Sequence, residues 1–471
     1  MRRVKIVCTI GPATCHEAGI QGLLQAGMDM ARLNGSHADL AWHAAAITLI
    51  RTCAPGIPIL LDIPGRKIRT GTLTVEPVFE VGSTIILTTN PGDDGTRAVP
   101  VNRPDLHDHI KVGDAILADD GTLRFTVTAV RGRDLVCRAE TSGTLRSAKG
   151  INVPGVAMGP QDLTPRDHAM IAFAVEHGVD FVGISFVESA AHVEAVRRLT
   201  GPSGPRILSK VENLGAMSNL SEVVRTSDAI MIDRGDLSVE TNLEEVALMQ
   251  KKILLAGLEH AVPVIVATEM LHSMIDNAVP TKAEVSDITN AVIDGATALM
   301  LSGETAVGRH PLAAVALMRR VADTVAESVQ AGMDAAEGST IPEAVGEAVA
   351  LLCRRLPITR IVAITISGYA ARMVAACRPR QGIIAVTNDP TRVRSLGLLH
   401  GTEAVLLPIV FSRTSTDHIV ECLRLLWCEG RLGDDDLVLV TSVGYPRSGT
   451  RMNLIQTHAI RDLSVGLGWQ R

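Results

Sequence analysis

One stretch of the chain, ILLDIPGRKIRTG at residues 59–71, brings several charges to the end of an apolar run. The run is typical of a buried strand, Asp62 stands at its end, and Lys67 and Arg69 follow shortly after it. These charges could form a solvated turn, or they could converge on an anionic ligand at the carboxyl ends of parallel strands. The stretch taken alone does not decide between these two hypotheses.

Other short apolar runs also end in side chains that can do chemistry. In chain order, the residues at these ends are Gly11, then Arg32, Asn34, Ser36 and His37, then Asp62, Lys67 and Arg69, then Ser185, Phe186 and Glu188, then Lys210 and Glu212, then Arg234, Gly235 and Asp236, then Thr268 and Glu269, and finally Ser302 and Glu304. In a barrel of parallel strands, the reacting groups come from the carboxyl ends of the strands. We therefore expect a ring of cations, carboxylates and hydroxyls at one face of a barrel.

Two carboxylates of this set, Glu212 and Asp236, follow successive apolar runs. Mg²⁺ binds a few carboxylate oxygens and otherwise keeps water or phosphate oxygens, so this pair suits a magnesium site. Lys210 stands two residues before Glu212 and therefore on the same side of a strand, because side chains alternate with a period of two. Lys210, a metal and Arg32 together would hold a phosphoryl group, whose charge is spread over three oxygens. The pattern predicts phosphoryl transfer.

Each motif also has a simpler explanation. Lys210 and Glu212 could form a structural ion pair, and the tetrapeptide RGDL at residues 234–237 is common. His37 could be an ordinary surface histidine, and Phe186 could be a core residue. The chemical interpretation is favoured because all of these residues fall at strand ends of one expected barrel. The chain contains neither the P-loop pattern GxxxxGK[ST] nor GxGxxG, so any nucleotide must be bound in another way.

The elements that must position these residues alternate between strand and helix. In residues 162–179, for example, helical periodicity is framed by Thr164 as N-cap, Pro165 in the first turn and Gly178 as the stop. Such alternation indicates a parallel sheet with helices outside it, and eight such strands suit a (β/α)8 TIM barrel. We expect the barrel to span residues 1–71 and 149–330.

Two further domains are expected where the alternation of strands and helices is interrupted. Residues 72–148 contain β-rich segments joined by Gly and Asp turns, which predicts an all-β lid domain inserted in one barrel loop. After a linker that starts near residue 331, strands and helices alternate again, which predicts a C-terminal α/β domain over residues 331–471. The expected fold class is therefore α/β, a TIM barrel with an inserted β lid and a C-terminal α/β domain.

Composition narrows the class of protein. The 471 residues carry a net charge of −6 and only 2% aromatic residues, which argues against a nucleic-acid-binding protein. No apolar run reaches membrane-spanning length, and the start of the chain is interpreted as a core strand and not as a signal peptide. The eight cysteines form no C-x-x-C pair, which is typical of free thiols in a reducing compartment. We expect a cytoplasmic enzyme that acts on a small acidic metabolite and contacts no membrane.

Nine segments of the chain resemble pyruvate kinase, in order and over nearly its full length. They are KIVCTIGPAT, AGMDMARLNGSH, LLDIPGRKIRTG, KGINVPG, SKVEN, RGDLSVE, VIVATEML, PTKAEVSDITNAV and LMLSGETAVGRHP. The resemblance implies a barrel interrupted by a β lid domain, a C-terminal regulatory domain and a homotetramer. It also implies transfer of a phosphoryl group from phosphoenolpyruvate to ADP with Mg²⁺ or Mn²⁺, which gives pyruvate and ATP in the last step of glycolysis.

The resemblance further implies roles for individual residues at the reacting centre. Arg32 and Lys210 would contact the phosphoryl group, with Lys210 stabilising charge during its transfer. Glu212 and Asp236 would hold the metal. Catalysis would then consist of positioning and electrostatics, with no covalent enzyme intermediate.

Substrate and nucleotide contacts are implied in the same way. The backbone amides of Gly235 and Asp236, together with the catalytic hydroxyl of Thr268, would bind the substrate carboxylate at a helix start. The residues implied at the nucleotide phosphates are Asn34, His37, Arg69 and, from the hinge of the lid, Lys149. Binding of both substrates would therefore draw on the barrel mouth and on the lid.

Lys67 departs from the family pattern at a position that bears on whether a monovalent cation is required. Many family members read Asp-Thr-Lys-Gly-Pro-Glu where residues 62–67 read Asp-Ile-Pro-Gly-Arg-Lys, so an acidic residue has become Lys67. Members with glutamate there resemble K⁺-dependent enzymes, and members with lysine resemble K⁺-independent ones. A tethered ammonium near the monovalent-cation region of Asn34, Ser36, Asp62 and Ile63 would replace the ion, so we expect no K⁺ requirement. A lysine that points to solvent is the alternative.

Three acidic residues, Glu188, Asp233 and Glu269, also depart from the family pattern, and Asp233 stands where the family has alanine. Extra acids near a site for a trianionic substrate should weaken its binding or reposition a cation, because such a cleft screens charge poorly. These departures leave two alternatives open. One is a paralogue that acts on a related enol phosphate in a specialised pathway, and the other is a non-catalytic regulatory relative.

Overall fold

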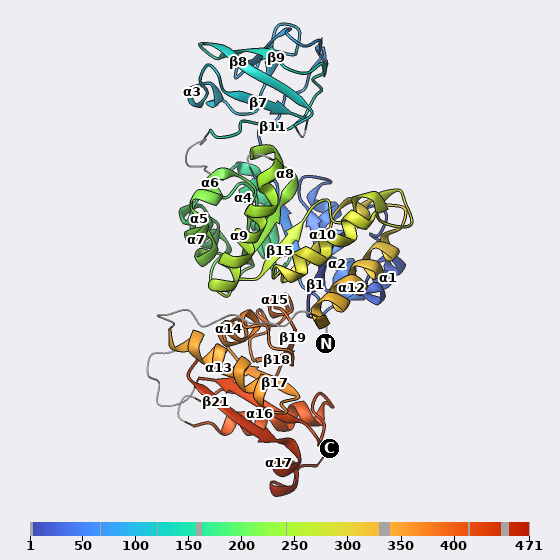
Figure 1. Ribbon diagram of the computed structural model, residues 1–471, viewed down its shortest axis with the longest axis vertical. Helices are drawn as coiled ribbons and strands as arrows, with labels where there is room; N and C mark the ends of the chain where they lie inside the picture. The colour runs from blue at the N-terminus through green and yellow to red at the C-terminus, as the bar shows by residue number, and fades with distance from the viewer. Residues whose placement is uncertain are drawn as a thin grey trace.

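The computed structural model describes residues 3–65, 67–119, 121–156, 163–241, 243–328, 340–412, 415–443 and 452–470. Three bodies follow one another along the long axis of the molecule, with the lid at one end, the barrel in the middle and the C-terminal domain at the other end (Figure 1). The expected fold class is confirmed. The domain limits at 71/72 and 148/149 stay predictions, and the limit at 330/331 lies outside the described residues.

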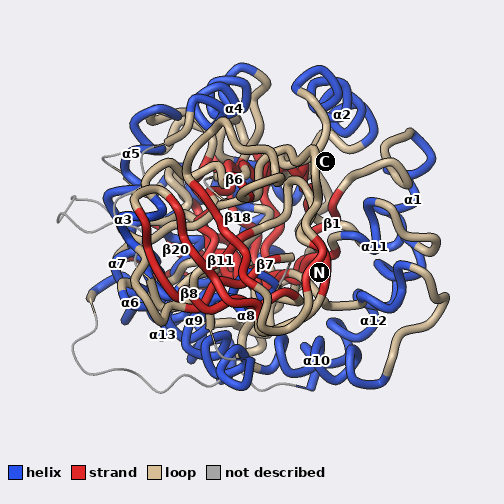
Figure 2. Tube along the Cα trace, turned by 90° about the horizontal axis from the view of Figure 1, so that it is seen from above, coloured by secondary structure: helices blue, strands red, loops and turns tan. Residues whose placement is uncertain are grey.

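Eight parallel strands close into a barrel within the described ranges, in the order β1-β16-β15-β14-β13-β12-β3-β2. The strands are β1 (Lys5–Thr9), β2 (Met30–Asn34), β3 (Ile59–Ile63), β12 (Phe181–Ile184), β13 (Arg206–Val211), β14 (Ala229–Asp233), β15 (Val264–Ala267) and β16 (Ala298–Leu301). The helices are α1 (Glu17–Ala26), α2 (Leu40–Cys53), α4 (Pro165–Glu176), α5 (Ala190–Thr200), α6 (Leu214–Ser218), α7 (Leu220–Thr226), α8 (Arg234–Glu240), α9 (Val246–Glu259), α10 (Lys282–Ile293), α11 (Gly303–Ala306) and α12 (Pro311–Ser328), with 3₁₀ helices η1 (Leu243–Glu245) and η2 (His272–Ile275). Figure 2 shows the helices arranged around the strands.

Helix α4 illustrates how the local sequence sets the limits of an element. The Thr164 hydroxyl accepts a hydrogen bond from the Asp167 amide at 3.0 Å, and the Asp167 carboxylate accepts one from the Thr164 amide at 2.9 Å. This capping box satisfies amides that the first turn leaves without helical partners. Pro165 begins the helix, and Gly178 follows its end with a φ of +58°, which glycine adopts without strain. The predicted start and stop of this helix are confirmed.

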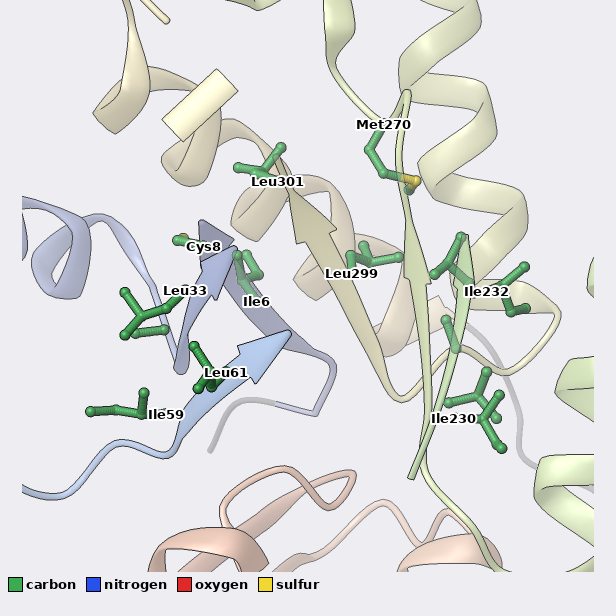
Figure 3. Packing of buried hydrophobic residues seen from close by; sticks show 14 of the residues in the cluster. Ile6, Cys8, Leu33, Ile59, Leu61, Ile230, Ile232, Met270, Leu299 and Leu301 are labelled. Carbon is green, nitrogen blue, oxygen red and sulfur yellow. The ribbon is translucent and has the colours of Figure 1, made fainter. Parts of the chain in front are cut away.

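The interior of the barrel is apolar toward the amino ends of its strands and polar at their carboxyl ends. Side chains on a strand alternate between the two faces, so residues two positions apart point the same way. Buried interior residues include Val7, Met30, Leu60, Leu208 and Met231. Alternate residues such as Ile6, Leu33, Leu61, Ile230 and Ile232 belong to the cluster packed between strands and helices (Figure 3). Two positions after the interior residues stand Thr9, Arg32, Asp62, Lys210 and Asp233. Alternation therefore predicts that these five side chains share the barrel mouth.

The lid domain is inserted between β3 and β12. Its described residues form a sheet in the order β11-β7-β8-β9-β5-β6 and a ladder of β10 with β4. Its elements are β4 (Val78–Phe79), β5 (Thr84–Thr88), β6 (Val99–Pro100), α3 (Leu106–His109), β7 (Ala115–Ala118), β8 (Leu123–Arg131), β9 (Asp134–Ala139), β10 (Gly143–Thr144) and β11 (Ile151–Asn152). It has its own core, in which the rings of Phe79 and Phe125 lie 5.3 Å apart. A bridge between Arg69 and Gly150 pairs the two segments that join lid and barrel.

The C-terminal domain is a parallel sheet with one antiparallel edge strand, in the order β19-β18-β17-β20-β21. Its elements are α13 (Ile341–Arg355), β17 (Arg360–Ile364), α14 (Tyr369–Ala376), β18 (Gly382–Thr387), α15 (Val393–Leu396), β19 (Thr402–Leu406), α16 (Asp417–Cys428), β20 (Leu437–Ser442), β21 (Leu454–Ala459) and α17 (Ile460–Gly466). Of the helices in the described part of the chain, none combines the length and the apolar character needed to cross a membrane.

The C-terminal domain closes the amino end of the barrel. Leu398, which follows α15, is 1% exposed and belongs to the same buried cluster as the interior residues of the barrel. Lys5 at the start of β1 donates from Nζ to the Thr402 carbonyl at 2.8 Å. Arg394 donates from Nε to Oδ1 of Asp180 at 2.7 Å. The floor of the barrel is thus built partly by residues of another domain.

We expect Leu398→Ala to destabilise the barrel by about 2–5 kcal/mol, because the change removes a buried side chain and leaves a cavity. Scanning calorimetry should show a clearly lower unfolding temperature than for the wild type. Leu406→Ala is the matched control, since Leu406 lies in the same domain but is 44% exposed. Equal shifts for the two variants would contradict a floor that depends on Leu398.

Candidate active site

The polar layer at the mouth of the barrel is a compact cluster of charges. Its members are Arg32 on β2, Asp62 on β3, Lys210 on β13, Glu212 directly after β13, Asp233 at the end of β14 and Asp236 in the first turn of α8. All except Asp236 are less than a tenth exposed. Charges this deeply buried are costly unless they are paired, so the pairing decides what the cluster can do.

Arg32 is held by two partners. Its Nε and Nη2 donate to Oδ2 of Asp62 at 3.0 and 2.7 Å, and its Nη1 donates to the Thr9 hydroxyl at 3.1 Å. Charge-assisted hydrogen bonds of this kind fix the orientation of a guanidinium. Oδ1 of Asp62 is buried and accepts no hydrogen bond from any residue that the structure describes. Asp62 therefore orients Arg32 through one oxygen and leaves the other uncommitted.

The ammonium of Lys210 lies at the centre of the cluster. Its Nζ is 3.1 Å from both Oε2 of Glu212 and Oδ2 of Asp233. It is 3.7 Å from Oδ2 of Asp62, and it donates to the Ser185 hydroxyl at 3.2 Å. Burial alone lowers the pKa of a lysine, but the surrounding carboxylates raise the pKa of Lys210 well above its ordinary value. Lys210 therefore keeps its positive charge at the barrel mouth.

Three carboxylates beside this ammonium could hold a cation. One oxygen from each of Glu212, Asp233 and Asp236 lies within 4.8 Å of the others. Burial raises the pKa of Glu212 to about 8, although Lys210 opposes the shift. Burial and the neighbouring Asp233 raise the pKa of Asp236. At Asp233 the effect of burial is outweighed by Lys210, and the pKa is lowered. A bound cation would relieve this crowding of negative charge.

Lys67 contacts this group instead of the expected monovalent-cation region. Its Nζ forms an ion pair with Oδ1 of Asp236, and both side chains are largely buried. Among the described residues, its ammonium makes no hydrogen bond with Asn34, Ser36 or Asp62. The carbonyl of Ile63, the remaining residue of that region, accepts a hydrogen bond from the Ser185 hydroxyl at 2.9 Å. The lysine therefore does not point to solvent, and its charge lies beside the candidate metal ligands.

Thr268 and Gly235 form a small polar corner beside the carboxylates. The Thr268 hydroxyl accepts from the Gly235 amide at 2.9 Å and donates to the Ala267 carbonyl at 2.6 Å. Thr268 has a φ of +66°, in the left-handed region that is costly for a β-branched residue. Arg234 supports the turn, because its guanidinium donates to the Thr268 carbonyl at 2.7 Å and pairs with Asp287. The strain is thus held in place by a neighbouring ion pair.

Two residues expected at the nucleotide phosphates lie at the end of β2, which Asn34 closes, and on the loop after it, which carries His37. Asn34 is half-buried, and its Oδ1 accepts from the Ser36 amide at 3.1 Å. His37 is exposed, as a surface histidine would be. Neither side chain is joined by a hydrogen bond to the Lys210 cluster among the described residues. Asn34 nevertheless follows Arg32 on β2 and His37 comes three residues later, so both come from the carboxyl end of that strand.

The other two residues expected there lie at the neck of the lid. Arg69 donates from Nη1 to the Ala148 carbonyl at 3.0 Å. Nζ of Lys149 is 2.7 Å from Oδ1 of Asp119, which belongs to the lid. These two cations therefore depend on the position of the lid, whereas Arg32 and Lys210 are fixed by the barrel.

Sequence reasoning missed Thr9 as a member of the cluster, and it expected Asp233 only as an extra acid near the site, without naming its partner. Thr9 supports Arg32, and Asp233 pairs with Lys210. Both could have been found from alternation, because Thr9 stands two positions after the interior residue Val7, and Asp233 stands two positions after Met231.

The remaining departures and strand-end residues lie around this cluster. Glu269 is exposed, and Glu188 is half-buried in a cleft of about 330 Å³ lined by residues of lid and barrel. Among the three acidic departures, all within the described ranges, only Asp233 joins the cluster. Phe186 acts through its backbone, since its amide donates to Oε1 of Glu212 at 2.6 Å. Its side chain is half-buried, so it is not a full core residue.

Comparisons with known proteins agree over nearly the whole chain. The family model for the pyruvate kinase barrel domain matches residues 1–315, and the model for the pyruvate kinase alpha/beta domain matches residues 343–458. Pyruvate kinase of Mycobacterium intracellulare is 38% identical over 476 residues, which cover 98% of this chain and 100% of that protein. Pyruvate kinase of Bacillus licheniformis is 36% identical over 479 residues, with 98% and 81% covered.

A solved structure extends the agreement to three dimensions. The crystal structure of a pyruvate kinase from Cryptosporidium parvum is similar with a TM-score of 0.90 and 30% sequence identity, and the match covers 98% of this chain and 96% of that one. Barrel, lid and C-terminal domain thus have counterparts in a single related chain. With family models, full-length relatives and this structure in agreement, the chain belongs to the pyruvate kinase family.

Proposed function

We propose that this protein transfers the phosphoryl group of phosphoenolpyruvate to ADP, forming pyruvate and ATP, with a divalent cation as cofactor. The observation that carries the proposal is the convergence of Arg32, Lys210, Glu212 and Asp236 at one end of the barrel. Charged groups fixed where negative charge is transferred are the main source of catalysis in phosphoryl transfer. A paralogue with another substrate and a non-catalytic relative are not favoured, because the full-length relatives are pyruvate kinases.

Glu212 and Asp236 are the proposed ligands of Mg²⁺ or Mn²⁺. Both offer carboxylate oxygens, which these cations prefer, and Oε2 of Glu212 is buried without a hydrogen bond from the described part of the chain. When bound, the cation would neutralise charge on the phosphoryl group and polarise substrate oxygens. Lys67 and Lys210 contact the same carboxylates, so the cation and the two ammonium groups share that negative charge.

Arg32 and Lys210 are the proposed phosphoryl-binding cations. The bond from phosphorus to the enol oxygen breaks while a bond forms to a phosphate oxygen of ADP, and the enolpyruvate left behind takes a proton at carbon. Lys210 would stabilise the charge that passes through the transfer, since its neighbours keep it protonated. Arg32 would orient the group, because Asp62 and Thr9 restrict its guanidinium to one arrangement.

The corner of Gly235, Asp236 and Thr268 is the proposed site for the substrate carboxylate. Backbone amides at the start of a helix favour an anion, and here the Gly235 amide donates to the Thr268 hydroxyl, which places the two groups side by side. Thr268 is held in a strained conformation there, which is typical of residues positioned for function.

The nucleotide phosphates are proposed to bind between the loop after β2 and the neck of the lid. Asn34 and His37 would contact them from the barrel, and Arg69 and Lys149 would do so from the neck. Two half-buried cations at a hinge support this assignment, because an anion between lid and barrel would draw the lid toward the barrel.

K⁺ is proposed not to be required, because a tethered ammonium stands in for its charge. The support is the half-buried ammonium of Lys67, which contacts Asp236 beside the proposed metal ligands. Its position differs from the region expected from the sequence, so the ammonium would act through the charge of the site and not by occupying the same point.

A homotetramer and a cytoplasmic location are also proposed. The resemblance to the family supports the tetramer, and gel filtration with light scattering measures it. The eight cysteines, all within the described ranges, are free thiols, which supports a reducing compartment.

We expect turnover in a lactate-dehydrogenase-coupled assay with phosphoenolpyruvate, ADP and Mg²⁺. Lys210→Ala should lower kcat by at least about a hundredfold, because it removes a charge aimed at the transferred group. Lys252→Ala is the matched control, as this lysine is exposed on α9, and it should retain activity. Wild-type turnover no greater than that of Lys210→Ala would refute the proposed function.

For the monovalent cation, we expect wild-type activity without added K⁺ and no more than a modest change when KCl is added. Lys67→Glu should make activity depend on K⁺, because it exchanges the tethered cation for a carboxylate beside Asp236. Lys67→Gln separates loss of the ammonium from gain of the acid. The coupled assay in Tris buffer with and without KCl measures all three, and a manyfold rise of the wild-type rate with KCl would contradict the prediction.

For the lid, Lys149→Ala should raise KM for ADP by about tenfold or more, the effect of losing a hydrogen bond to a charged group worth about 1.5–3 kcal/mol. KM for phosphoenolpyruvate should change little. Lys111→Ala removes an exposed lysine of the lid and serves as control. An equal change of both KM values would argue against a nucleotide contact by Lys149.

A further inference from the structure

Asp233 adds a third carboxylate to the proposed metal site, at a position where the family resemblance implies alanine. We propose that Asp233 is a third direct ligand of the divalent cation, beside Glu212 and Asp236. The inference rests on the proposed function, which assigns the metal to Glu212 and Asp236. It goes beyond that function by adding a protein ligand that the family resemblance does not imply.

The register of two neighbouring strands sets Asp233 beside Glu212. Strands β13 and β14 pair in parallel, with Val211 opposite Ile232. Glu212, the residue after Val211, therefore lies beside Asp233, the residue after Ile232. Both follow interior residues by alternation and both point to the barrel mouth. Asp236 comes one turn later at the start of α8, and the three carboxylates each bring an oxygen within 4.8 Å of the others. Hard divalent cations are held by such sets of carboxylate oxygens.

Two observations besides the cluster of acids point to a cation. Within the described ranges, Oε2 of Glu212 is buried and accepts no hydrogen bond, although it forms an ion pair with the Lys210 ammonium at 3.1 Å. The carboxylates also already attract tethered cations, because Lys210 lies 3.1 Å from Asp233 and Lys67 pairs with Asp236. The site therefore has a buried oxygen that is ion-paired with Lys210 but accepts no hydrogen bond among the described residues, and its neighbouring carboxylates already attract positive charge.

Asp233 changes the balance of positive and negative charges at the barrel mouth. Among the described residues of the cluster, the cations are Arg32, Lys67 and Lys210, and the acids are Asp62, Glu212, Asp233 and Asp236. Asp233 therefore adds a fourth acid to a cluster in which three cations face three other acids. An added carboxylate in a poorly screened, buried place favours an entering dication.

The position of Oδ1, the carboxylate oxygen of Asp233 that does not face Lys210, favours metal ligation over a role limited to the ion pair with Lys210. A β-carbon built on Gly235 would lie 3.6 Å from Oδ1 of Asp233 and 3.7 Å from Oγ1 of Thr268, so this oxygen faces the proposed carboxylate corner. A free carboxylate there would repel the carboxylate of the substrate. A carboxylate that ligates a cation is neutralised and does not oppose binding. Metal ligation thus reconciles Asp233 with an anionic substrate.

The first test measures binding of Mn²⁺ to the free enzyme, without phosphoenolpyruvate or ADP, by the electron paramagnetic resonance signal of unbound Mn²⁺. Asp233→Ala should weaken binding by about tenfold or more. Glu188→Gln, which neutralises a half-buried acid outside the cluster, should leave binding unchanged. Glu212→Gln reports on the metal site itself, and melting temperatures establish that each variant is folded.

The outcomes separate the inference from the proposed function. If Glu212→Gln weakens Mn²⁺ binding and Asp233→Ala leaves it within about twofold, Asp233 is not a ligand, and the proposed function is unaffected. If neither variant weakens binding, the metal assignment and the inference both fail. Because no turnover is measured, absence of activity with phosphoenolpyruvate would not change the reading of these results.

A second variant distinguishes direct ligation from an electrostatic effect exerted through Lys210. Asp233→Cys should add a thiolate-to-metal charge-transfer absorption with Cd²⁺ and raise the preference for Cd²⁺ over Mn²⁺, because thiolates prefer soft cations. The wild type, with its eight free thiols, gives the baseline, and Asp233→Ala gives the effect of losing the charge alone. If Asp233→Cys shows no absorption above the wild type and the same metal preference as Asp233→Ala, direct ligation by Asp233 is overturned.

Discussion

Every second side chain of a strand in a closed barrel must fill the interior, and the rest of this structure depends on that constraint. Along β2, β3, β13 and β14 an apolar residue fills the interior, and the residue two positions later is Arg32, Asp62, Lys210 or Asp233. The hydrophobic core and the chemical site are therefore successive layers of the same strands. A shift of one position in any strand would exchange its core residues and its site residues with outward-facing ones.

The polar layer persists because its charges are paired with one another. Arg32 pairs with Asp62, and Lys210 is shared among Glu212, Asp233 and Asp62. Removing one member of such a buried network leaves its partner charged and without compensation, which costs more than the pair itself contributes. The same network sets the protonation of the site, since the carboxylates raise the pKa of Lys210 against the effect of burial. The C-terminal domain closes the floor below this centre through Leu398, and Lys149 at the neck of the lid pairs with Asp119 of the lid.

Much of this arrangement was predictable, and the exceptions have physical reasons. The strand ends, the Lys210 and Glu212 spacing and the capping of α4 follow from local rules, and the structure agrees with them. The contact of Lys67 was not predictable, because it depends on the path of the loop after β3 toward α8, far along the chain. The support of Arg32 by Thr9 was not predicted, because Gly11 was taken as the end of the first apolar run, whereas alternation places Thr9 inside the barrel.

The sequence by itself determined the order of strands and helices, the family and the set of residues at the strand ends, because these depend on periodicity and on motifs read along the chain. Only the tertiary structure decided which of those residues meet. It brought Asp233 against Lys210 and Glu212, paired Lys67 with Asp236, and left Glu188 and Glu269 outside the cluster. The reason is that these contacts depend on strand register and barrel closure, which are set by packing among residues far apart in the sequence.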